Sequence, residues 1–205
     1  MSKEPKKINY ASHCFITERQ TTMNIEKDIK SILVSEKELD TITTRLAKEI
    51  TEFYKDSTRD LLILTILKGS FVFSADLVRK IDLPMEFDFM KVSSYGADTV
   101  SSGNLKISLD ISRDDLGDLD ILVIEDIVDS GFTLSNLKAY LSERGAGSVK
   151  ICTLLDKPSR RKYPLEADFV GAAIPDEFVV GYGLDYNEKY RHLKFVGVLS
   201  PDVYS

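Results

Sequence analysis

Apolar residues recur every three or four positions in the first clearly patterned part of the chain, which is the spacing of one helix face. Ser35 and Glu38 stand at the start of this pattern with the spacing of a capping box. We therefore predict an amphipathic helix from Ser35, a second helix from about Phe71 to Lys80, and a third that stops near Gly145. The apolar face of the first helix is formed by Leu39, Ile42, Leu46, Ile50 and Phe53.

Short apolar runs separate these helices. Three of them, Leu61 to Ile66, Asp120 to Ile124 and Val149 to Leu155, are too short for surface helices and suit strands covered on both faces. Between residues 85 and 90 the side chains alternate in character, which is typical of a strand with two different faces. Further short runs that favour strands cover 105–110, 168–174, 178–182 and 195–199.

The alternation of strands and helices predicts an α/β fold, in which a doubly wound parallel sheet carries helices on both faces with right-handed crossovers. Residues 1–22 show neither period, so we expect a loosely ordered extension followed by a single domain over 23–205. Met23 is a candidate second start. Ser93 to Gly103 consists mostly of small, hydroxyl and glycine residues and is predicted to form a mobile loop.

Charge and cysteine content narrow the class of protein. With 27 Lys and Arg against 33 Asp and Glu, the formal net charge is −6, which disfavours binding to a polyphosphate backbone, so we expect no nucleic-acid partner. Cys14 and Cys152 are too few for a disulfide framework, and no signal-peptide pattern follows Met1. No apolar run approaches the roughly 20 residues that cross a bilayer. We therefore expect a cytoplasmic protein with no membrane partner.

The run VIEDIVDSGFTL, residues 123–134, places three carboxylates where a buried strand meets a helix. Ligands of parallel sheets bind beyond the carboxyl ends of the strands, so this position favours a site. Glu125 and Asp126 are adjacent, and two carboxylates about 4 Å apart repel by roughly 4 kcal/mol at an effective dielectric of about 20. A magnesium ion and a sugar diol would compensate that repulsion.

The residues after Asp129 favour the opposite charge. Ser130, Gly131 and Thr133 lead into the helix, where unpaired backbone N–H groups and the helix dipole attract an anion such as a phosphate. The turn therefore offers carboxylates for a diol or metal and amides for a phosphate, which matches the two ends of a ribose 5-phosphate. A simpler alternative is that Asp129 or Ser130 only caps the helix and that the other two acids are solvated.

The same run resembles the motif that binds phosphoribosyl diphosphate (PRPP) in type I phosphoribosyltransferases. Four further stretches are similar in order and spacing to the hypoxanthine-guanine phosphoribosyltransferases, and the resemblance covers about residues 23–204. These stretches are LKGS (67–70), SSYGADTVSSG (93–103), LLDKPSRR (154–161) and PDEFVVGYGLDYNEKYR (175–191).

The resemblance implies the type I phosphoribosyltransferase fold, with a small hood subdomain and a flexible catalytic loop. It implies magnesium-dependent transfer of phosphoribose from PRPP to hypoxanthine or guanine, and a homodimer or homotetramer. Ser94 and Tyr95 would be the loop pair that closes over the reacting centre. A cis peptide between Leu67 and Lys68 is also implied.

The implied ligand contacts cover magnesium and the ribose, the phosphate groups of PRPP, and the purine. Magnesium and the ribose hydroxyls would be held by Glu125 and Asp126, with Asp185 as a second acid on the magnesium. The proton at purine N7 would be accepted by Asp129. The 5-phosphate would be wrapped by Ser130, Gly131, Phe132 and Thr133, and pyrophosphate would be bound by Lys68, Gly69 and Arg191. The implied purine-binding residues are Lys157 at the 6-oxo group, Phe178 stacked on the ring, Val179 through its backbone, and Asp185, which is grouped with them.

Each of these residues has a less specific interpretation when taken singly. Lys68 resembles a solvated lysine at a strand end, and Phe178 resembles a core residue of an apolar run. Asp185 and Arg191 resemble surface ion-pair partners. His13 and Cys14 lack companions at metal-ligand spacing. The main alternative function is a regulatory module that senses nucleotide on the same fold and contacts RNA or DNA.

Overall fold

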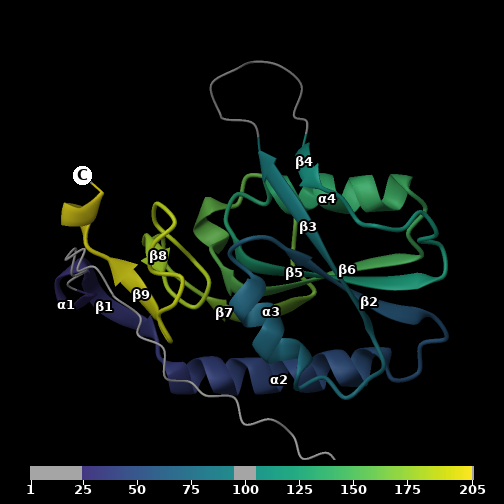
Figure 1. Cartoon of the computed structure of the whole chain (residues 1–205), viewed down its shortest axis with the longest axis horizontal. Coiled ribbons are helices and arrows are strands. Elements are labelled where there is room, and N and C mark those ends of the chain that lie inside the picture. The colour runs from purple at the N-terminus through teal and green to yellow at the C-terminus, as the bar shows by residue number, and fades with distance from the viewer. Residues whose placement is uncertain (1–24, 95–104, 205) are drawn as a thin grey trace, which may run out of the picture.

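The structure is a computed structural model that describes residues 25–94 and 105–204. It contains a six-stranded sheet with the order β4-β3-β2-β5-β6-β7 and a three-stranded sheet with the order β1-β9-β8 (Figure 1). The strands of the larger sheet are β2 (Asp60–Ile66), β3 (Glu86–Ser94), β4 (Leu105–Leu109), β5 (Leu119–Val128), β6 (Ser148–Asp156) and β7 (Phe169–Ala173).

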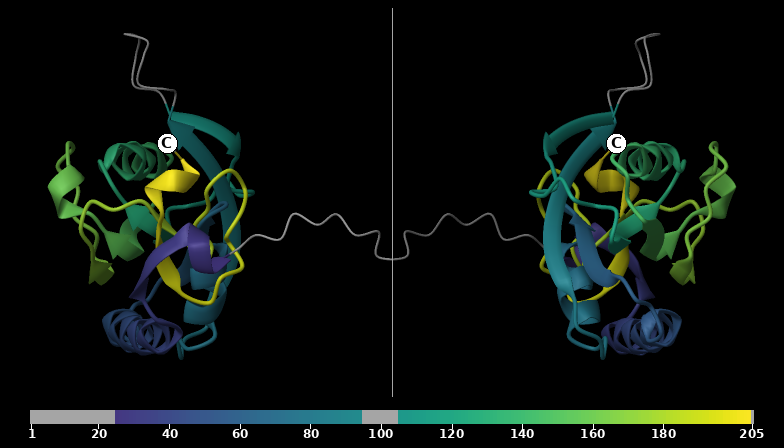
Figure 2. Two further views of the ribbon diagram at one scale, coloured as in Figure 1. Left: turned by 90° about the vertical axis from the view of Figure 1, so that its left-hand side faces the viewer. Right: turned by 90° about the vertical axis from the view of Figure 1, so that its right-hand side faces the viewer.

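Helices cover both faces of the larger sheet (Figure 2). Residues of α2 and α3 share a core with one face of the sheet, whereas residues of α4 share a core with the other face. All neighbouring strands are parallel except β4, which runs antiparallel to β3 at one edge. The predicted α/β class is therefore confirmed. The helical segments are α1 (Ile25–Asp28), α2 (Glu36–Tyr54), α3 (Phe71–Val78), α4 (Phe132–Glu143) and the 3-10 turns η1 (Pro158–Arg160) and η2 (Pro201–Val203).

Local chemistry explains where the helices begin and end. The Glu38 amide donates to Ser35 Oγ at 3.3 Å and the Ser35 amide donates to Glu38 Oε2 at 2.8 Å, which confirms the capping box at the start of α2. Gly145 adopts φ +85° just after α4, and this left-handed conformation ends the helix as predicted. Phe53 departs from the predicted apolar face, because it is exposed beside Phe169.

A topological switch point lies between β2 and β5. From β2 the chain proceeds to β3 and β4 on one side, and then returns to β5 on the other side of β2. Connections that leave neighbouring strands in opposite directions open a crevice at the carboxyl ends of those strands. The loops after β2 and β5 therefore meet where a ligand site is expected.

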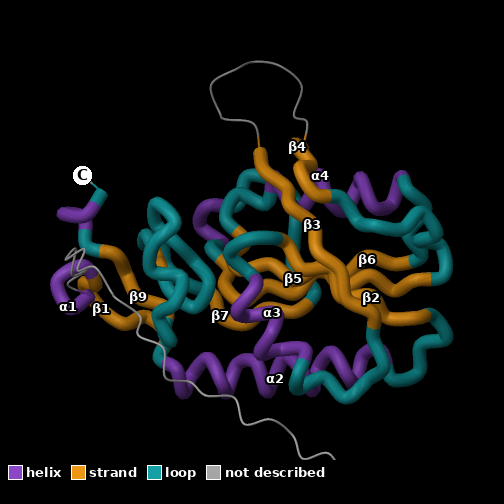
Figure 3. Tube along the Cα trace, in the orientation of Figure 1, coloured by secondary structure: helices purple, strands orange, loops and turns teal. Residues whose placement is uncertain are grey.

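The smaller sheet stands at one end of the larger one and forms the hood (Figure 3). It pairs β1 (Ile29–Val34) with β9 (Val196–Leu199), and β9 with β8 (Val179–Val180), all antiparallel. Strand β1 was not predicted. The runs at 178–182 and 195–199 do form strands, but in this separate sheet.

Two boundaries differ from the sequence-based expectations. Strand β5 continues to Val128, so Glu125 and Asp126 lie within the strand and only Asp129 begins the turn. Ser94 is the last residue of β3, whereas Tyr95 and the rest of the predicted mobile loop lie outside the described residues. The predicted extension, with His13 and Cys14, also lies outside them. No helix of the described chain is long and apolar enough to cross a membrane.

Candidate active site

The carboxylates of Glu125 and Asp126 are half-buried near the carboxyl end of β5. Glu125 Oε2 is buried, and no hydrogen bond reaches it from the described residues. Burial, and then the neighbouring charge of Asp126, raise the pKa of Glu125 well above its usual range. Burial also raises the pKa of Asp126 to about 6, against the opposing effects of the Ile127 amide and of Arg191. Among the described residues, Glu125 Oε2 therefore has no donor, whereas Asp126 Oδ1 accepts from the Ile127 amide at 2.7 Å.

The loop after β2 contacts this pair directly. A β-carbon placed on Gly69 would lie 1.4 Å from Asp126 Oδ2, so only glycine allows the approach. A β-carbon on Gly183, in the hood, would lie 2.0 Å from the carbonyl oxygen of Gly69. The Leu67–Lys68 peptide bond is cis, as predicted. Three segments distant in sequence thus converge within contact distance at the switch point.

The turn after β5 forms a concave cradle. Gly131 has φ +84° and stands at the start of α4 without a side-chain cap. A small cavity of about 90 Å³ is lined by residues 127–134 and by Glu125, and it includes the four residues predicted to wrap a phosphate. Asp129 does not cap α4, so the capping alternative does not account for it. The other half of that alternative has support, because Ser130 Oγ accepts a hydrogen bond from the Phe132 amide at 3.3 Å. Backbone donors at the start of a helix suit an anion.

Lys157 lies directly after β6, beside this turn. Its backbone amide donates to the Val128 carbonyl oxygen at 2.9 Å, which fixes it next to the end of β5. Its side chain is buried, and Nζ donates to the Glu177 carbonyl oxygen at 2.8 Å. An ammonium has three donors, so two remain for other acceptors.

Phe178 is a surface residue, which removes the core interpretation of this side chain. It is 40% exposed, and its ring stacks on Tyr204 with centroids 5.1 Å apart and an interplanar angle of 28°. Tyr186 meets the same ring edge-on at 5.7 Å. Val179 follows in β8, where its side chain is buried and its backbone pairs with Val198. The hood thus presents an aromatic platform beside a strand edge.

Four charged residues connect the hood to the loop after β2. Arg191 Nη2 lies 2.9 Å from Asp185 Oδ1 and 3.0 Å from Glu188 Oε2. Lys68 Nζ lies 2.9 Å from Glu188 Oε1. Glu188 therefore bridges the two cations predicted to bind pyrophosphate, and the hydrogen bond from Lys68, followed by that from Arg191, lowers the pKa of Glu188.

Sequence reasoning missed a second group of charges around Asp129. Arg160, at the end of η1, donates from Nε to Asp129 Oδ1 at 2.6 Å and from Nη1 to Asp176 Oδ1 at 3.2 Å. Arg161 donates to the Asp129 carbonyl oxygen and to the Asp156 carboxylate. Their position could have indicated a role, since both arginines follow β6, the strand next to β5 in the sheet.

The carboxylates of Glu125 and Asp126 could hold a magnesium ion only if a substrate supplied further oxygen ligands. Within residues 25–94 and 105–204, no three carboxylate, imidazole or thiol groups gather into a ready-made metal site. Mg²⁺ commonly binds one or two carboxylates and takes its other oxygens from water and substrate phosphates. Oε2 of Glu125, which is buried beside Asp126 and has no hydrogen-bond partner in the described part of the chain, is consistent with that mode.

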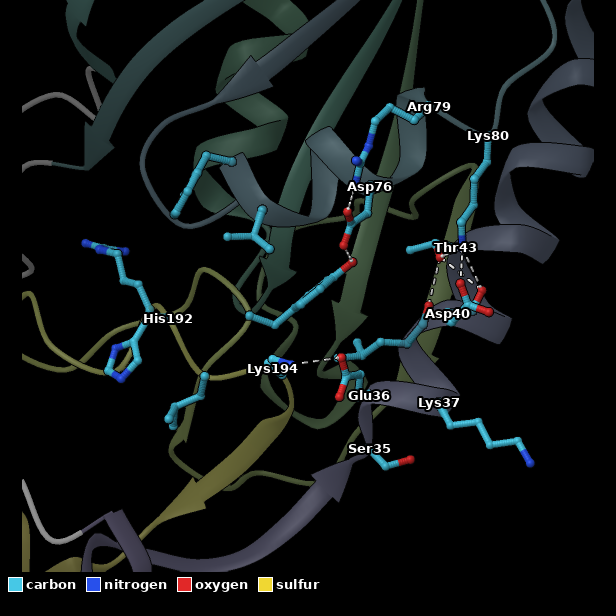
Figure 4. Close-up of a pocket in the computed structure, with 16 residues that line it drawn as sticks. Ser35, Glu36, Lys37, Asp40, Thr43, Asp76, Arg79, Lys80, His192 and Lys194 are labelled. Atoms are coloured by element: carbon cyan, nitrogen blue, oxygen red, sulfur yellow. Dashed lines mark hydrogen bonds and ion pairs between the residues drawn. The ribbon is translucent and has the colours of Figure 1, made fainter. Parts of the chain in front are cut away.

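A large cavity lies elsewhere, between the start of α2, α3 and the hood (Figure 4). Its volume is about 1010 Å³, and it shares Arg191 with the site described above. Its charged side chains are largely paired with one another, as shown by Lys80 with Asp40 at 2.6 Å and Lys194 with Glu36 at 3.7 Å. His192 lines this cavity and is exposed, as expected of a solvated residue.

Comparisons with known proteins agree on one family. A family model described as "Phosphoribosyl transferase domain" matches residues 29–187. A hypoxanthine-guanine phosphoribosyltransferase from Bacillus subtilis is 52% identical over 180 residues, covering 88% of this chain and 98% of that protein. A hypoxanthine phosphoribosyltransferase from Salmonella typhimurium is 47% identical over 171 residues, covering 83% and 96%. The crystal structure of a hypoxanthine phosphoribosyltransferase from Staphylococcus aureus superposes with a TM-score of 0.83 at 44% identity, covering 89% and 99%.

Proposed function

The chain belongs to the phosphoribosyl transferase domain family, and on that premise we propose that it transfers 5-phosphoribose from PRPP to hypoxanthine or guanine. The products are the purine nucleotide and pyrophosphate, so the reaction salvages free purine bases. The observation that carries the proposal is the arrangement at the end of β5, where the carboxylate of Glu125, whose Oε2 is buried without a partner among the described residues, adjoins a cradle at the start of α4.

The PRPP contacts follow from charge. Glu125 and Asp126 would receive the ribose hydroxyls, and Mg²⁺ bound with PRPP would neutralise negative charge on the carboxylates and the leaving pyrophosphate. The amides of residues 130–133 would hold the 5-phosphate. Lys68, Gly69 and Arg191 would hold pyrophosphate, with Asp185 as a further oxygen donor toward the ion. Arg191 suits this role because its planar fork binds two phosphate oxygens at once.

The chemical step is a displacement at ribose C1. The N9 lone pair of the purine forms the new bond to C1, the bond from C1 to pyrophosphate breaks, and pyrophosphate leaves with the electron pair. The proton on N7 passes to Asp129. Because the transition state resembles an oxocarbenium ion, catalysis depends on positioning and charge stabilisation rather than on a protein nucleophile.

Base selection depends on Lys157. Its ammonium would donate to the 6-oxo group of hypoxanthine or guanine, whereas adenine presents an amino donor at that position. An unpaired buried donor costs about 1–3 kcal/mol, so adenine is disfavoured. Phe178 would stack on the purine, and the backbone of Val179 would meet its Watson–Crick edge. The exposed ring of Phe178 beside Tyr204 and Tyr186 supports this platform role.

Self-association into a homodimer or homotetramer completes the proposal. Exposed aromatic side chains on α3 and β3 support it, since Phe71, Phe87 and Phe89 are each at least 40% exposed. The rings of Phe87 and Phe89 lie with their centroids 5.0 Å apart, and adjoining exposed apolar residues commonly mark association surfaces. Light scattering coupled to size-exclusion chromatography measures the subunit number.

A nucleobase panel tests the function. The purified protein is incubated with PRPP, Mg²⁺ and either hypoxanthine, guanine, xanthine or adenine, and nucleotide formation is followed. We expect product with hypoxanthine and guanine, loss of product on chelation of Mg²⁺, and little product with adenine. No nucleotide from any base, together with tight and salt-sensitive RNA binding, would support the regulatory-module alternative instead.

A further inference from the structure

Arg160, which the proposed mechanism does not use, occupies the centre of an alternating chain of charges. Its Nε donates to Asp129 Oδ1 at 2.6 Å, and its Nη1 donates to Asp176 Oδ1 at 3.2 Å. The same Asp176 oxygen lies 3.7 Å from Lys157 Nζ. The order of the chain is therefore Lys157, Asp176, Arg160, Asp129.

This chain links the two ends of the proposed purine site. Asp129 follows β5, Lys157 and Arg160 follow β6, and Asp176 lies between β7 and β8. Three separate loops are thus tied together through one guanidinium. A fork held by two acids on different loops is fixed in direction as well as position, which a single exposed ion pair would not achieve.

The hydrogen bond from Arg160 to Asp129 leaves one carboxylate oxygen of Asp129 available. Arg160 takes Oδ1, and among the residues that the structure describes no hydrogen bond reaches Oδ2. The Asp129 backbone is held independently, because Arg161 donates to its carbonyl oxygen. With backbone and Oδ1 both fixed, the free Oδ2 has a defined direction. A base that is itself oriented by a third group is a recurring arrangement in catalytic sites.

We propose that Arg160 is a positioning residue that aims the Asp129 carboxylate at the purine and, through Asp176, aligns it with Lys157. The inference rests on the proposed function, since it takes Asp129 and Lys157 as the groups that meet the base. Its energetic basis is orientation rather than net charge. Exposed ion pairs contribute little to stability, and the three side chains are 43–52% exposed, so removal of Arg160 should leave folding intact.

The test separates kcat from KM. Arg160→Ala should lower kcat with hypoxanthine by about 10-fold to 100-fold, the range of well-placed orienting groups, while KM for PRPP changes less than about twofold. Arg160→Lys keeps the charge but lacks the fork, so it should recover only part of the loss. Arg79→Ala is the matched control, because it removes another exposed arginine paired with an aspartate, Asp76, and should leave kcat unchanged.

Double variants decide whether Arg160 acts through Asp129. In an Asp129→Asn background, Arg160→Ala should cause no further loss, since there is no longer a base to orient. In an Arg160→Ala background, Asp176→Asn should likewise change kcat by less than about twofold. Additive losses in these backgrounds would overturn the inference, because they would show a general structural role.

The remaining outcomes are equally decisive. An active wild-type enzyme with an Arg160→Ala variant of equal kcat would overturn the positioning role and leave the proposed function standing. A higher kcat in the variant would show that Arg160 obstructs Asp129, and would also overturn it. An inactive wild-type protein would contradict the proposed function, and this inference with it.

Discussion

Gly69 and Asp126 lie so close that a β-carbon on Gly69 would stand 1.4 Å from Asp126 Oδ2. This contact brings the loop after β2 against the carboxylate pair of β5 at the switch point of the sheet. The pyrophosphate and ribose ends of PRPP therefore share one junction in the proposed site.

A methyl group at Gly69 should disrupt that junction. Overpacking costs about 1–3 kcal/mol, so Gly69→Ala is expected to lower kcat/KM for PRPP by roughly 10-fold to 100-fold. Gly117→Ala is the control, because its β-carbon would meet its nearest neighbour, the Gly145 carbonyl oxygen, only at 3.8 Å. Equal steady-state kinetics for the two variants would show that the contact does not matter for PRPP.

The half-buried carboxylates of Glu125 and Asp126 should make the ligand-free protein less stable at neutral pH. Burial raises the folded-state pKa of Asp126 to about 6, above the ordinary value of about 4. Between these values the folded state binds more protons than the unfolded chain, so stability falls as pH rises through this window. Asp126→Asn should therefore raise the free energy of unfolding by about 1–3 kcal/mol at pH near 7.5.

Denaturant unfolding without Mg²⁺ and PRPP measures this effect. The advantage of Asp126→Asn over the wild type should shrink toward zero near pH 4, where the folded-state carboxyl is already protonated. Asp82→Asn, at an exposed position, serves as control and should follow the wild type. A constant difference between wild type and Asp126→Asn across this pH range would contradict the account.

Asp129→Asn should separate chemistry from PRPP binding. The amide cannot accept the N7 proton, and general acid–base groups typically contribute about 10²-fold to 10⁴-fold, so kcat should fall by that order. PRPP affinity, measured by calorimetry with Mg²⁺, should change by less than about threefold, because the backbone cradle persists. Unchanged turnover would remove Asp129 from proton transfer.

Lys157→Ala should weaken discrimination between bases. Loss of the donor to the 6-oxo group is expected to lower the ratio of kcat/KM for hypoxanthine to that for adenine by about 10-fold to 100-fold. Lys150→Ala, at a half-buried lysine paired with Asp168, is the control. A variant that rejects adenine as strongly as the wild type would assign base selection to other groups.

The strand, turn and helix around the acids of β5 were predictable because each element has a local signature. The apolar run, the glycine turn and the leucine stripe follow one another in the sequence. Together they predicted a site at the carboxyl end of a strand. The extension of β5 through Glu125 and Asp126 was not predictable in this way, because the two half-buried carboxylates interrupt the apolar pattern that marks a strand.

Structural features that join distant segments of the chain are harder to predict from the sequence. Strand β1 pairs with β9, which lies more than 160 residues later in the sequence. The residues near β1 in the sequence therefore give no sign of this pairing. The ion pairs of Arg160 join loops after three different strands, and exposed charges follow no period. Only the order of strands in the sheet shows that these loops meet.

A crystal structure of the protein with PRPP and Mg²⁺ tests the central claim most directly. The account predicts the ribose hydroxyls beside Glu125 and Asp126, and the 5-phosphate on the amides of residues 130–133. A sugar phosphate bound away from this turn, such as in the large cavity between α2 and the hood, would contradict it.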